Sequence, residues 1–245
     1  MYQRHTLAIL SALCFLTALS ACHAETRANS LTPQQVQAGW VLLFDGETTF
    51  GWAGRGSSDW KVTDGMITSK SGGPGMLATT TEFADFDLHA DVWVDNKVNS
   101  GIMVRGPLKG DITPLTSYEV NVYDAHKEWP SGSINFVGRT KSKVKTVGRW
   151  STYDIHAEGG HLVVNVIGKT TVDAMDSKFA RGIIALQYNG EGEVKFRNVR
   201  LRPLTTKPLF NGKDLTGWYV VPGHKSVFTV SQEGWLSIKN GNGDI

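Results

Sequence analysis

"STYDIHAEGGHLVVNVIGKTTVD", residues 151–173, alternates apolar and polar side chains with a period of two on both sides of a Gly-Gly pair. Successive side chains of a β-strand point to opposite faces, so this alternation predicts strands that each bury one face. The glycines at 159 and 160 mark a tight turn between them. The segment therefore predicts a compact antiparallel hairpin.

The same alternation recurs along most of the chain. Glycine-rich breaks at residues 71–75, 158–160 and 189–192 separate the segments, and only residues 32–38, which begin Thr-Pro, suggest a short helix. Many short strands at this spacing predict an all-β fold, an antiparallel β-sandwich or jelly roll. The other predicted strands are residues 87–95, 100–106, 117–124, 182–189 and 193–204.

The composition is that of an ordinary globular protein. The 245 residues are 40% hydrophobic and 20% charged, and 25 basic against 23 acidic residues leave a formal net charge of +2. We find no dense basic run with interleaved aromatic residues. The sequence therefore indicates no nucleic-acid partner.

The first residues predict export. Residues 1–24 carry Arg4, then an apolar run too short to span a bilayer in the usual way, then small residues, which is typical of a bacterial signal peptide. "LSAC", ending at Cys22, resembles a lipobox and predicts a periplasmic or outer-membrane lipoprotein anchored at Cys22. Cleavage after Ala24 is the alternative. No cysteine follows Cys22, so no intrachain disulfide is expected in the exported part.

One phrase occurs twice. "LLFDGETTFGW" at residues 42–52 returns as "PLFNGKDLTGW" at residues 208–218. The offset is far longer than a solenoid or propeller repeat and fits one complete sandwich. We therefore expect one domain over residues 31–204 and the start of a second, truncated copy over residues 205–245. The alternative is that this tail donates strands to the first sandwich.

The alternation also sorts side chains onto faces. If the apolar sets form the core, one sheet carries charged, amide and aromatic groups together on its outer face. Rings stack on sugar faces, and carboxylates and amides bond sugar hydroxyls, so this face is a candidate sugar platform. A solvated face with cross-strand ion pairs is the alternative. The residues assigned to this face are Trp93, Arg105, Glu119, Asn121, Tyr123 and Gln187.

Six short motifs occur in a familiar order: "GWVLLFDGETTFGW", "NSGIMVRG", "YEVNVYD", "GSINF", "GRWSTYDI" and "EVKFRNVRLRPL". Over residues 37–204 the sequence resembles the 3-keto-disaccharide hydrolase family, also described as 3-keto-glucoside 1,2-lyases and 3-keto-2-hydroxy-glucal hydratases. The resemblance implies a concanavalin A-like jelly roll of two antiparallel sheets and a secreted or lipid-anchored bacterial protein. It also implies 3-keto-sugar substrates supplied by a separate sugar 3-dehydrogenase.

The implied chemistry begins at the ketone. A carbonyl at C3 acidifies the hydrogen on C2, so a general base can remove it while an electrophile stabilises the enolate. The glycosidic oxygen then leaves C1 by β-elimination. Water can add across the resulting glycal, and the net result is hydrolysis.

The resemblance assigns roles to particular residues. Glu119, the glutamate of the "YEV" phrase, is the candidate base or metal ligand, and Arg105 is the candidate partner for the carbonyl or enolate oxygen. Their alternative is a structural ion pair. His126 is a candidate acid for the leaving group, next to Asp124 at the end of a strand, or it is an ordinary exposed histidine. The candidate substrate-binding residues are Trp93, Asn121, Tyr123, Trp129 and Gln187, and Trp129 could instead plug a loop.

No cofactor is assigned. A divalent metal held by Glu119, Asp124 and His126 stays open, because these side chains offer oxygen and nitrogen ligands without a compact spacing motif. The rival hypothesis to an enzyme is a non-catalytic carbohydrate-binding module on the same fold. A laminarinase-type glycanase is disfavoured, since its E-x-D-x-x-E strand motif does not occur.

Overall fold

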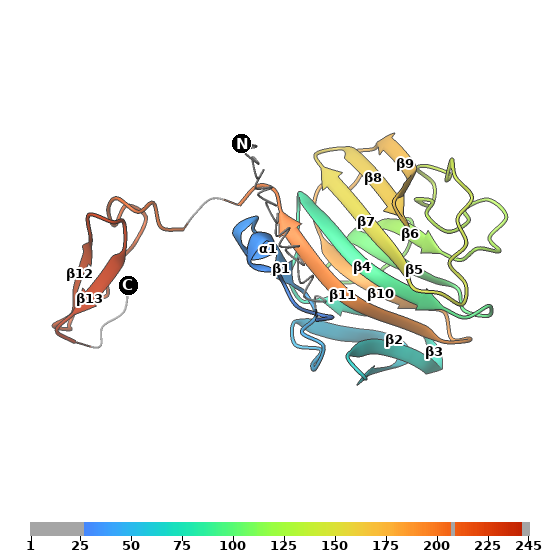
Figure 1. Ribbon diagram of the computed structural model, residues 1–245, viewed down its shortest axis with the longest axis horizontal. Coiled ribbons are helices and arrows are strands. Elements are labelled where there is room, and N and C mark those ends of the chain that lie inside the picture. The colour runs from blue at the N-terminus through green and yellow to red at the C-terminus, as the bar shows by residue number, and fades with distance from the viewer. Residues whose placement is uncertain (1–26, 207–208, 242–245) are drawn as a thin grey trace, which may run out of the picture.

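The all-β prediction is confirmed by the structure (Figure 1). A computed structural model describes residues 27–206 and 209–241, so the predicted signal segment with Cys22 lies outside the described residues. No helix in this described part of the chain is long and apolar enough to cross a membrane. The elements are α1 (Pro33–Gln37), β1 (Val41–Leu42), β2 (Trp52–Thr63), β3 (Met66–Thr79), β4 (Phe86–Val94), β5 (Ser100–Gly106), β6 (Tyr118–Val122), β7 (Ser151–Glu158), β8 (His161–Val166), β9 (Lys169–Met175), β10 (Ile183–Tyr188), β11 (Val194–Pro203), β12 (Val227–Val230) and β13 (Leu236–Lys239).

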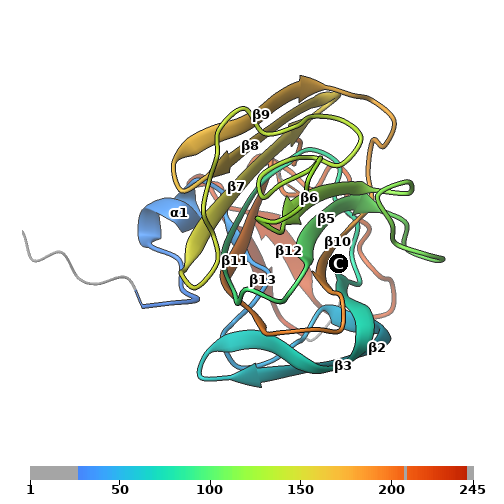
Figure 2. The ribbon, with the colours of Figure 1, turned by 90° about the vertical axis from the view of Figure 1, so that its right-hand side faces the viewer.

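Eleven strands form one antiparallel sheet that curls into a sandwich. Its order is β6-β5-β10-β3-β11-β4-β7-β8-β9, with β1 added to β11 and β2 added to β3. The sheet folds over at β3. We call β2, β3, β10, β5 and β6 the first layer, and β11, β4, β7, β8 and β9 the second layer. Figure 2 shows β2 and β3 at the bottom of the view, where they close one side of the sandwich.

Strand β3 serves both layers. Residues 67–69 pair with β11, and residues 75–78 pair with β10. The prediction that residues 71–75, "SGGPG", break the chain between strands is therefore wrong, because they lie inside this one 14-residue strand. Gly72 has φ +84°, and a Cβ there would lie 2.3 Å from the carbonyl oxygen of Ser57 on β2. Glycine is needed at this bend because the neighbouring backbone leaves no room for a side chain.

The core lies between the two layers. Ile102, Val104 and Val120 of the first layer belong to the same buried cluster as Leu88 and Val92 of the second. Each such side chain contributes about 1.5–3 kcal/mol when it leaves water. Their burial fixes which face of each strand points inward. It thereby fixes the alternate residues of β5 and β6 on the outer face of the first layer.

Several local predictions are confirmed. Helix α1 begins with a capping box, in which Thr32 Oγ1 accepts from the Gln35 amide at 3.2 Å and Gln35 Oε1 accepts from the Thr32 amide at 2.9 Å. The segment 151–173 contains a third strand beyond the predicted hairpin. Ile167 and Gly168, at φ +50° and +69°, form the second tight turn.

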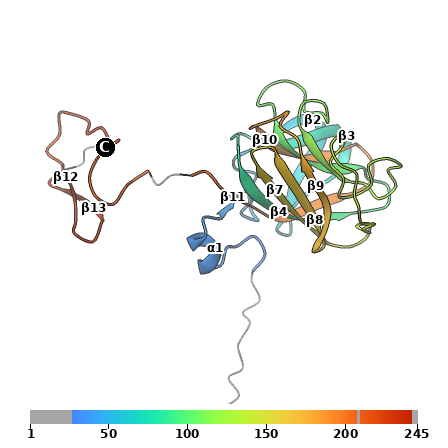
Figure 3. The same cartoon turned by 90° about the horizontal axis from the view of Figure 1, so that it is seen from above.

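The tail forms a separate hairpin. Strands β12 and β13 pair with each other and with no other strand in the part of the chain that the structure describes (Figures 1 and 3). Among the described residues, the tail thus adds no strand to the first sandwich. The repeated phrase makes the same contact twice: Trp52 Nε1 donates to the Leu43 carbonyl, and Trp218 Nε1 donates to the Leu209 carbonyl at 3.1 Å. That the tail begins a second domain stays a prediction.

Candidate functional site

Two rows of side chains cross the outer face of the first layer, perpendicular to its strands. Directly opposite residues of antiparallel strands point to the same face. The first row contains Ala53, Ala78, Ala185, Met103 and Glu119. The second row contains Arg55, Met76, Gln187, Gly101 and Asn121. The alanines and the glycine keep these rows low, so we call them the floor. Glu119 and Asn121 lie at the β6 end of the floor, and Gln187 lies on β10, the middle strand. We call these three residues with Asn135 the outer-face site.

Glu119 is the acid of the outer-face site. Its side chain is only 4% exposed, and Asn135 Nδ2 donates to its Oε2 at 2.8 Å. Burial raises the pKa of Glu119 above the ordinary 4.5, and hydrogen bonds from the Asn135 and Gln187 side chains partly offset this rise. A carboxyl group with a raised pKa is a stronger base once ionised. This is the property that general-base catalysis requires near neutral pH.

Two amide oxygens beside Glu119 are buried without a hydrogen bond. Asn135 Oδ1 and Gln187 Oε1 have no partner among the described residues. The third amide, of Asn121, donates to the Trp129 carbonyl. Leaving a buried acceptor unpaired costs about 1–3 kcal/mol, so such groups need an explanation. Each of these two oxygens could accept a hydrogen bond from a sugar hydroxyl.

A loop covers part of the floor. Ile112, from the segment between β5 and β6, packs on Ala78, Met103 and Ala185. Arg55, at the opposite edge of the floor, donates to the carbonyl oxygens of this segment at Pro107, Leu108 and Gly110. We call residues 107–117 the cover loop. Because the cover loop packs directly on the floor, a sugar ring can lie across the floor only if the loop moves away.

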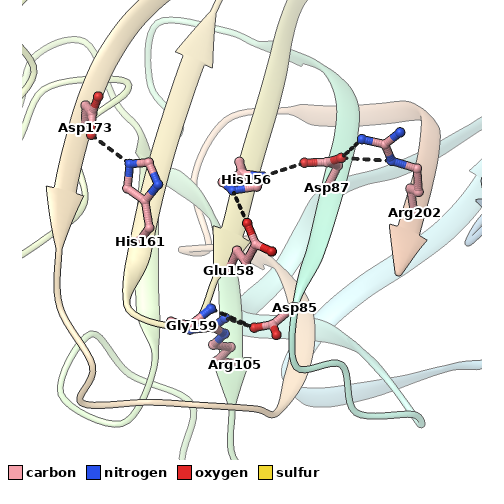
Figure 4. A network of polar contacts seen from close by, with 9 residues as sticks. All are labelled: Asp85, Asp87, Arg105, His156, Glu158, Gly159, His161, Asp173 and Arg202. Atoms are coloured by element: carbon pink, nitrogen blue, oxygen red, sulfur yellow. Dashed lines mark hydrogen bonds and ion pairs between the residues drawn. The ribbon is translucent and has the colours of Figure 1, made fainter. Parts of the chain in front are cut away.

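The predicted placement of Arg105 beside Glu119 is wrong. The Arg105 side chain is fully buried and belongs to another polar network (Figure 4). Its backbone has φ +56°, and the register of β5 with β10 shifts next to it, so the strand alternation fails there. Burial lowers the pKa of Arg105, and the Asp85 charge opposes this. Its guanidinium donates to the carbonyls of Ala84, Gly159 and Phe179 and to Asp85 Oδ1 at 2.7–3.0 Å.

Trp93 is also on a different face from Glu119. It belongs to β4 in the second layer, and the ammonium of Lys195 on β11 lies 4.5 Å from its ring centroid. The alternation correctly predicted that the Trp93 side chain points away from the core. It could not show that β4 and β6 belong to different layers, since strand pairing is not visible in a period of two.

Asp124 and His126 lie in the loops that follow β6. Asp124 accepts from the Thr146 amide at 2.9 Å and from Thr146 Oγ1 at 2.8 Å, so its carboxylate ties two loops together. His126 Nδ1 accepts from the Trp129 amide at 2.9 Å, and its ring is edge-on to Tyr123. Both residues line a cavity of about 450 Å³ whose lining does not include Glu119. The predicted catalytic set is therefore divided among three places.

This division bears on the metal alternative. Glu119 is bonded to Asn135, whereas Asp124 is bonded to Thr146 and His126 to backbone amides. Within residues 27–206 and 209–241, no three His, Cys, Asp or Glu side chains are placed together to hold a metal ion. The set of Glu119, Asp124 and His126 is thus not a preformed ligand cluster.

Sequence reasoning missed two residues that border the site. Asn135 and Phe136 lie in the quoted "GSINF" motif, but they follow β6 in a loop and so carry no strand alternation. The backbone N–H of Asn135 donates to the backbone carbonyl of Glu119 at 3.0 Å, which extends the first layer beyond β6. Phe136 is 63% exposed, and its ring centroid lies 5.9 Å from that of Trp129. The aromatic pair is therefore carried by backbone that is hydrogen-bonded to Asn121 and Glu119 of β6.

The antiparallel sandwich belongs to the jelly-roll class. Within that class, the chain belongs to the family of the 3-keto-alpha-glucoside-1,2-lyase-like domain, whose model matches residues 39–202. The resemblance seen in the sequence is thereby confirmed. A comparison with curated proteins finds no match.

Solved structures share the fold. A protein named "putative glycosyl hydrolase" from Parabacteroides distasonis ATCC 8503 superposes with a TM-score of 0.63 and 19% identity, covering 73% of this chain and 100% of that one. A second one from the same organism gives 0.57 and 23%, covering 67% and 99%. The carbohydrate-binding module CBM66 from Bacillus subtilis gives 0.50 and 20%, covering 62% and 95%. The family match and this fold indicate a carbohydrate-acting β-sandwich.

The raised pKa of Glu119 predicts a pH-dependent stability difference. The folded protein binds the Glu119 proton more tightly than the unfolded chain does, so ionisation destabilises the fold as pH rises through the unfolded value near 4.5. Glu119→Gln removes this ionisation. We expect its melting temperature, relative to the parent, to increase from about pH 4 to about pH 8 in thermal denaturation. A flat difference for Glu119→Gln would contradict the buried carboxylate.

Proposed function

We propose that this protein is an exported enzyme that cleaves 3-keto-glycosides, with Glu119 as the general base. One observation carries the proposal: the carboxylate that matches the family's motif is buried, with a raised pKa, among amides on the outer face of the first layer. Export rests on the signal-like residues 1–24. The substrate would be made by an oxidoreductase that converts the C3 hydroxyl of a glycoside to a ketone.

Glu119 would take the C2 proton of the bound 3-keto-sugar. The C2–H electrons form the C2=C3 bond of the enolate, and the enolate then re-forms the C3 ketone and a C1=C2 double bond as the C1–O bond breaks. The departing oxygen takes the proton from Glu119, so the products are a 2-hydroxy-glucal that retains the C3 ketone, the free aglycone alcohol and an ionised Glu119. In hydration, Glu119 accepts a proton from the water whose oxygen bonds C1 and delivers it to C2, which completes hydrolysis.

The amides around Glu119 would orient the sugar. The unpaired oxygens of Asn135 and Gln187 would accept from sugar hydroxyls, and amide N–H groups would be neutral donors for the developing enolate oxygen. Arg105 has no part in this step, because its donors are bound to carbonyls elsewhere. The aromatic pair of Trp129 and Phe136 offers a stacking surface at the edge of the site.

Substrate entry would require the cover loop to lift. Glu119 is almost closed off, and the floor beside it is covered by Ile112. The Arg55 contacts to the loop are hydrogen bonds at the protein edge, so water can replace them when the loop moves. Closure of the loop over a bound sugar would exclude water during elimination.

The decisive experiment follows product formation. The purified full chain is incubated with a 3-keto-glucoside and, separately, with the same glucoside before oxidation, and NMR follows release of the aglycone and the glycal. Cleavage of only the oxidised glycoside supports the proposal. Cleavage of both substrates points to ordinary glycoside hydrolysis and contradicts it.

The second candidate is a carbohydrate-binding protein without activity. The near-closure of Glu119 favours it, and the chain shares its fold with a carbohydrate-binding module. Binding of the 3-keto-glucoside without any cleavage, measured by calorimetry and NMR on the same sample, would establish this candidate.

Gly101→Ala provides a geometric test of the base. A Cβ at Gly101 would lie 3.0 Å from Glu119 Oε1 and 3.3 Å from Gln187 Oε1, so the carboxylate has to shift. A displacement of this kind at a reacting group costs up to about 10²-fold, and we expect kcat to fall by about 10-fold or more. Gly54→Ala is the matched control in the same layer, since nothing lies within 4 Å of its Cβ position. Equal rates for both variants would place the base elsewhere.

A further inference from the structure

The loops after β6 concentrate positive charge. Residues 138–149, "GRTKSKVKTVGR", contain five basic and no acidic side chains, although the whole chain has a net charge of only +2. The basic residues alternate with small or uncharged ones. The overall composition does not show this local excess of positive charge, because basic and acidic residues nearly balance over the whole chain.

Three of these cations converge on one cavity. Arg139, Lys143 and Lys145 line the cavity of about 450 Å³ described above, and Lys127 and His126 line it from the preceding loop. A volume of this size is within the range of small-ligand sites, which is roughly 300–1,000 Å³. We call it the loop cavity.

The lysines and Arg139 of the loop cavity outnumber its one carboxylate. None of the ion pairs found within the described residues involves its lysines or Arg139. Its one carboxylate, Asp124, accepts instead from the amide and hydroxyl of Thr146. Arg139 uses one nitrogen to donate to the Lys127 carbonyl at 3.0 Å, which holds the two walls together. Gathering like charges is unfavourable, and a bound anion would relieve it.

The loop cavity and the outer-face site share one segment of backbone. Pro130 and Ser131 line the cavity, while the next residues pair with β6: the Gly132 amide donates to the Asn121 carbonyl at 2.9 Å. Three residues further on, Asn135 binds Glu119. The loop cavity therefore borders the outer-face site across a single strand-like segment.

We propose that the loop cavity binds the oxyanion of an acidic saccharide, that is, a carboxylate or phosphate group carried by the sugar or aglycone. Lysine and arginine side chains supply charge-assisted hydrogen bonds to such oxygens. The saccharide part rests on the proposed function, whereas the oxyanion part rests on the cavity alone. The proposed substrate class is thus narrowed from 3-keto-glycosides in general to those that carry a negative charge.

Calorimetry on the full chain at low ionic strength tests this inference. The probes are glucose 6-phosphate, glucuronate, inorganic phosphate and glucose. We expect the two acidic sugars to bind at least about 10-fold more tightly than glucose or inorganic phosphate, and to weaken as salt is added. The imidazole NMR signals of His126 should shift on binding, because its ring lines the cavity.

A charge-matched pair of variants locates the site. The triple variant Arg139→Gln, Lys143→Gln, Lys145→Gln should lose at least about 10-fold in affinity for the acidic sugars. The control triple variant, Lys70→Gln, Lys97→Gln, Lys169→Gln, removes three exposed cations outside the cavity and should bind like the parent. Equal losses in both triple variants would show a general charge effect and overturn the proposal.

Other outcomes are equally informative. Inorganic phosphate binding as tightly as glucose 6-phosphate would make the loop cavity a site for a free anion and overturn the saccharide part. Binding only to vesicles that contain phosphatidylglycerol would indicate a membrane surface and overturn the whole inference. Because no turnover is measured, acidic-sugar binding without cleavage of any 3-keto-glycoside would refute the proposed function and leave this inference standing.

Discussion

We expect Glu119→Gln to lower kcat on a 3-keto-glucoside by about 10²-fold to about 10⁴-fold, the range that a general base contributes. Glutamine keeps the size of the side chain and can still meet Asn135, but it cannot accept a proton from C2. The binding contacts of Asn121 and Gln187 remain. KM should therefore change little, and the loss should appear in kcat when initial rates are measured over a range of substrate concentrations.

Glu191→Gln is the matched control for this experiment, since it removes an exposed carboxylate on the loop between β10 and β11. Its rates should equal those of the parent. Full activity of Glu119→Gln would show that the base does not lie in the outer-face site.

The largest stability effect is expected for Arg105→Ala. The guanidinium joins three carbonyls from separate segments and the Asp85 carboxylate, and its side chain has no exposure to solvent. Removing one member of a buried charged network leaves the others unpaired, which costs about 3–5 kcal/mol. Chemical denaturation followed by tryptophan fluorescence should show this loss in the free energy of unfolding.

Arg181→Ala supplies the comparison. Arg181 also pairs with a carboxylate, Glu82, at 3.0 Å, but 67% of its side chain is exposed. Exposed pairs contribute no more than about 1 kcal/mol, so this variant should unfold near the parent. If Arg105→Ala kept parental stability yet lost turnover per folded molecule, Arg105 would act in the chemistry and its structural role would be refuted.

The sequence predicted the fold well because strand alternation is a local property. The faces of β5 and β6 followed from it, and so did the shared face of Glu119, Asn121 and Gln187. Arg105 was misplaced because a bulge with positive φ interrupts the alternation at one residue. The bend at residues 71–75 was misread for a related reason: glycine permits both a turn and a strand that changes sheets.

The remaining part of the site depends on long-range placement. Trp93 and Glu119 are both on outward faces, but only the order of strands shows that these faces belong to different layers. Asn135 reaches Glu119 from a loop, and no periodic pattern marks a loop residue. The division of Asp124 and His126 from Glu119 likewise follows from hydrogen bonds across the loops, which a sequence does not display.

The shared strand β3 has a consequence for how the molecule withstands heat. Its two halves hydrogen-bond to β11 and to β10, so the two layers cannot separate unless β3 loses its hydrogen bonds to one of these strands or bends away from it. Unfolding of the first layer and loss of the hydrophobic core are thus coupled into one cooperative transition. On heating, the outer-face site would not stay intact while the core unfolds. Activity would therefore be lost in parallel with the fraction of folded protein.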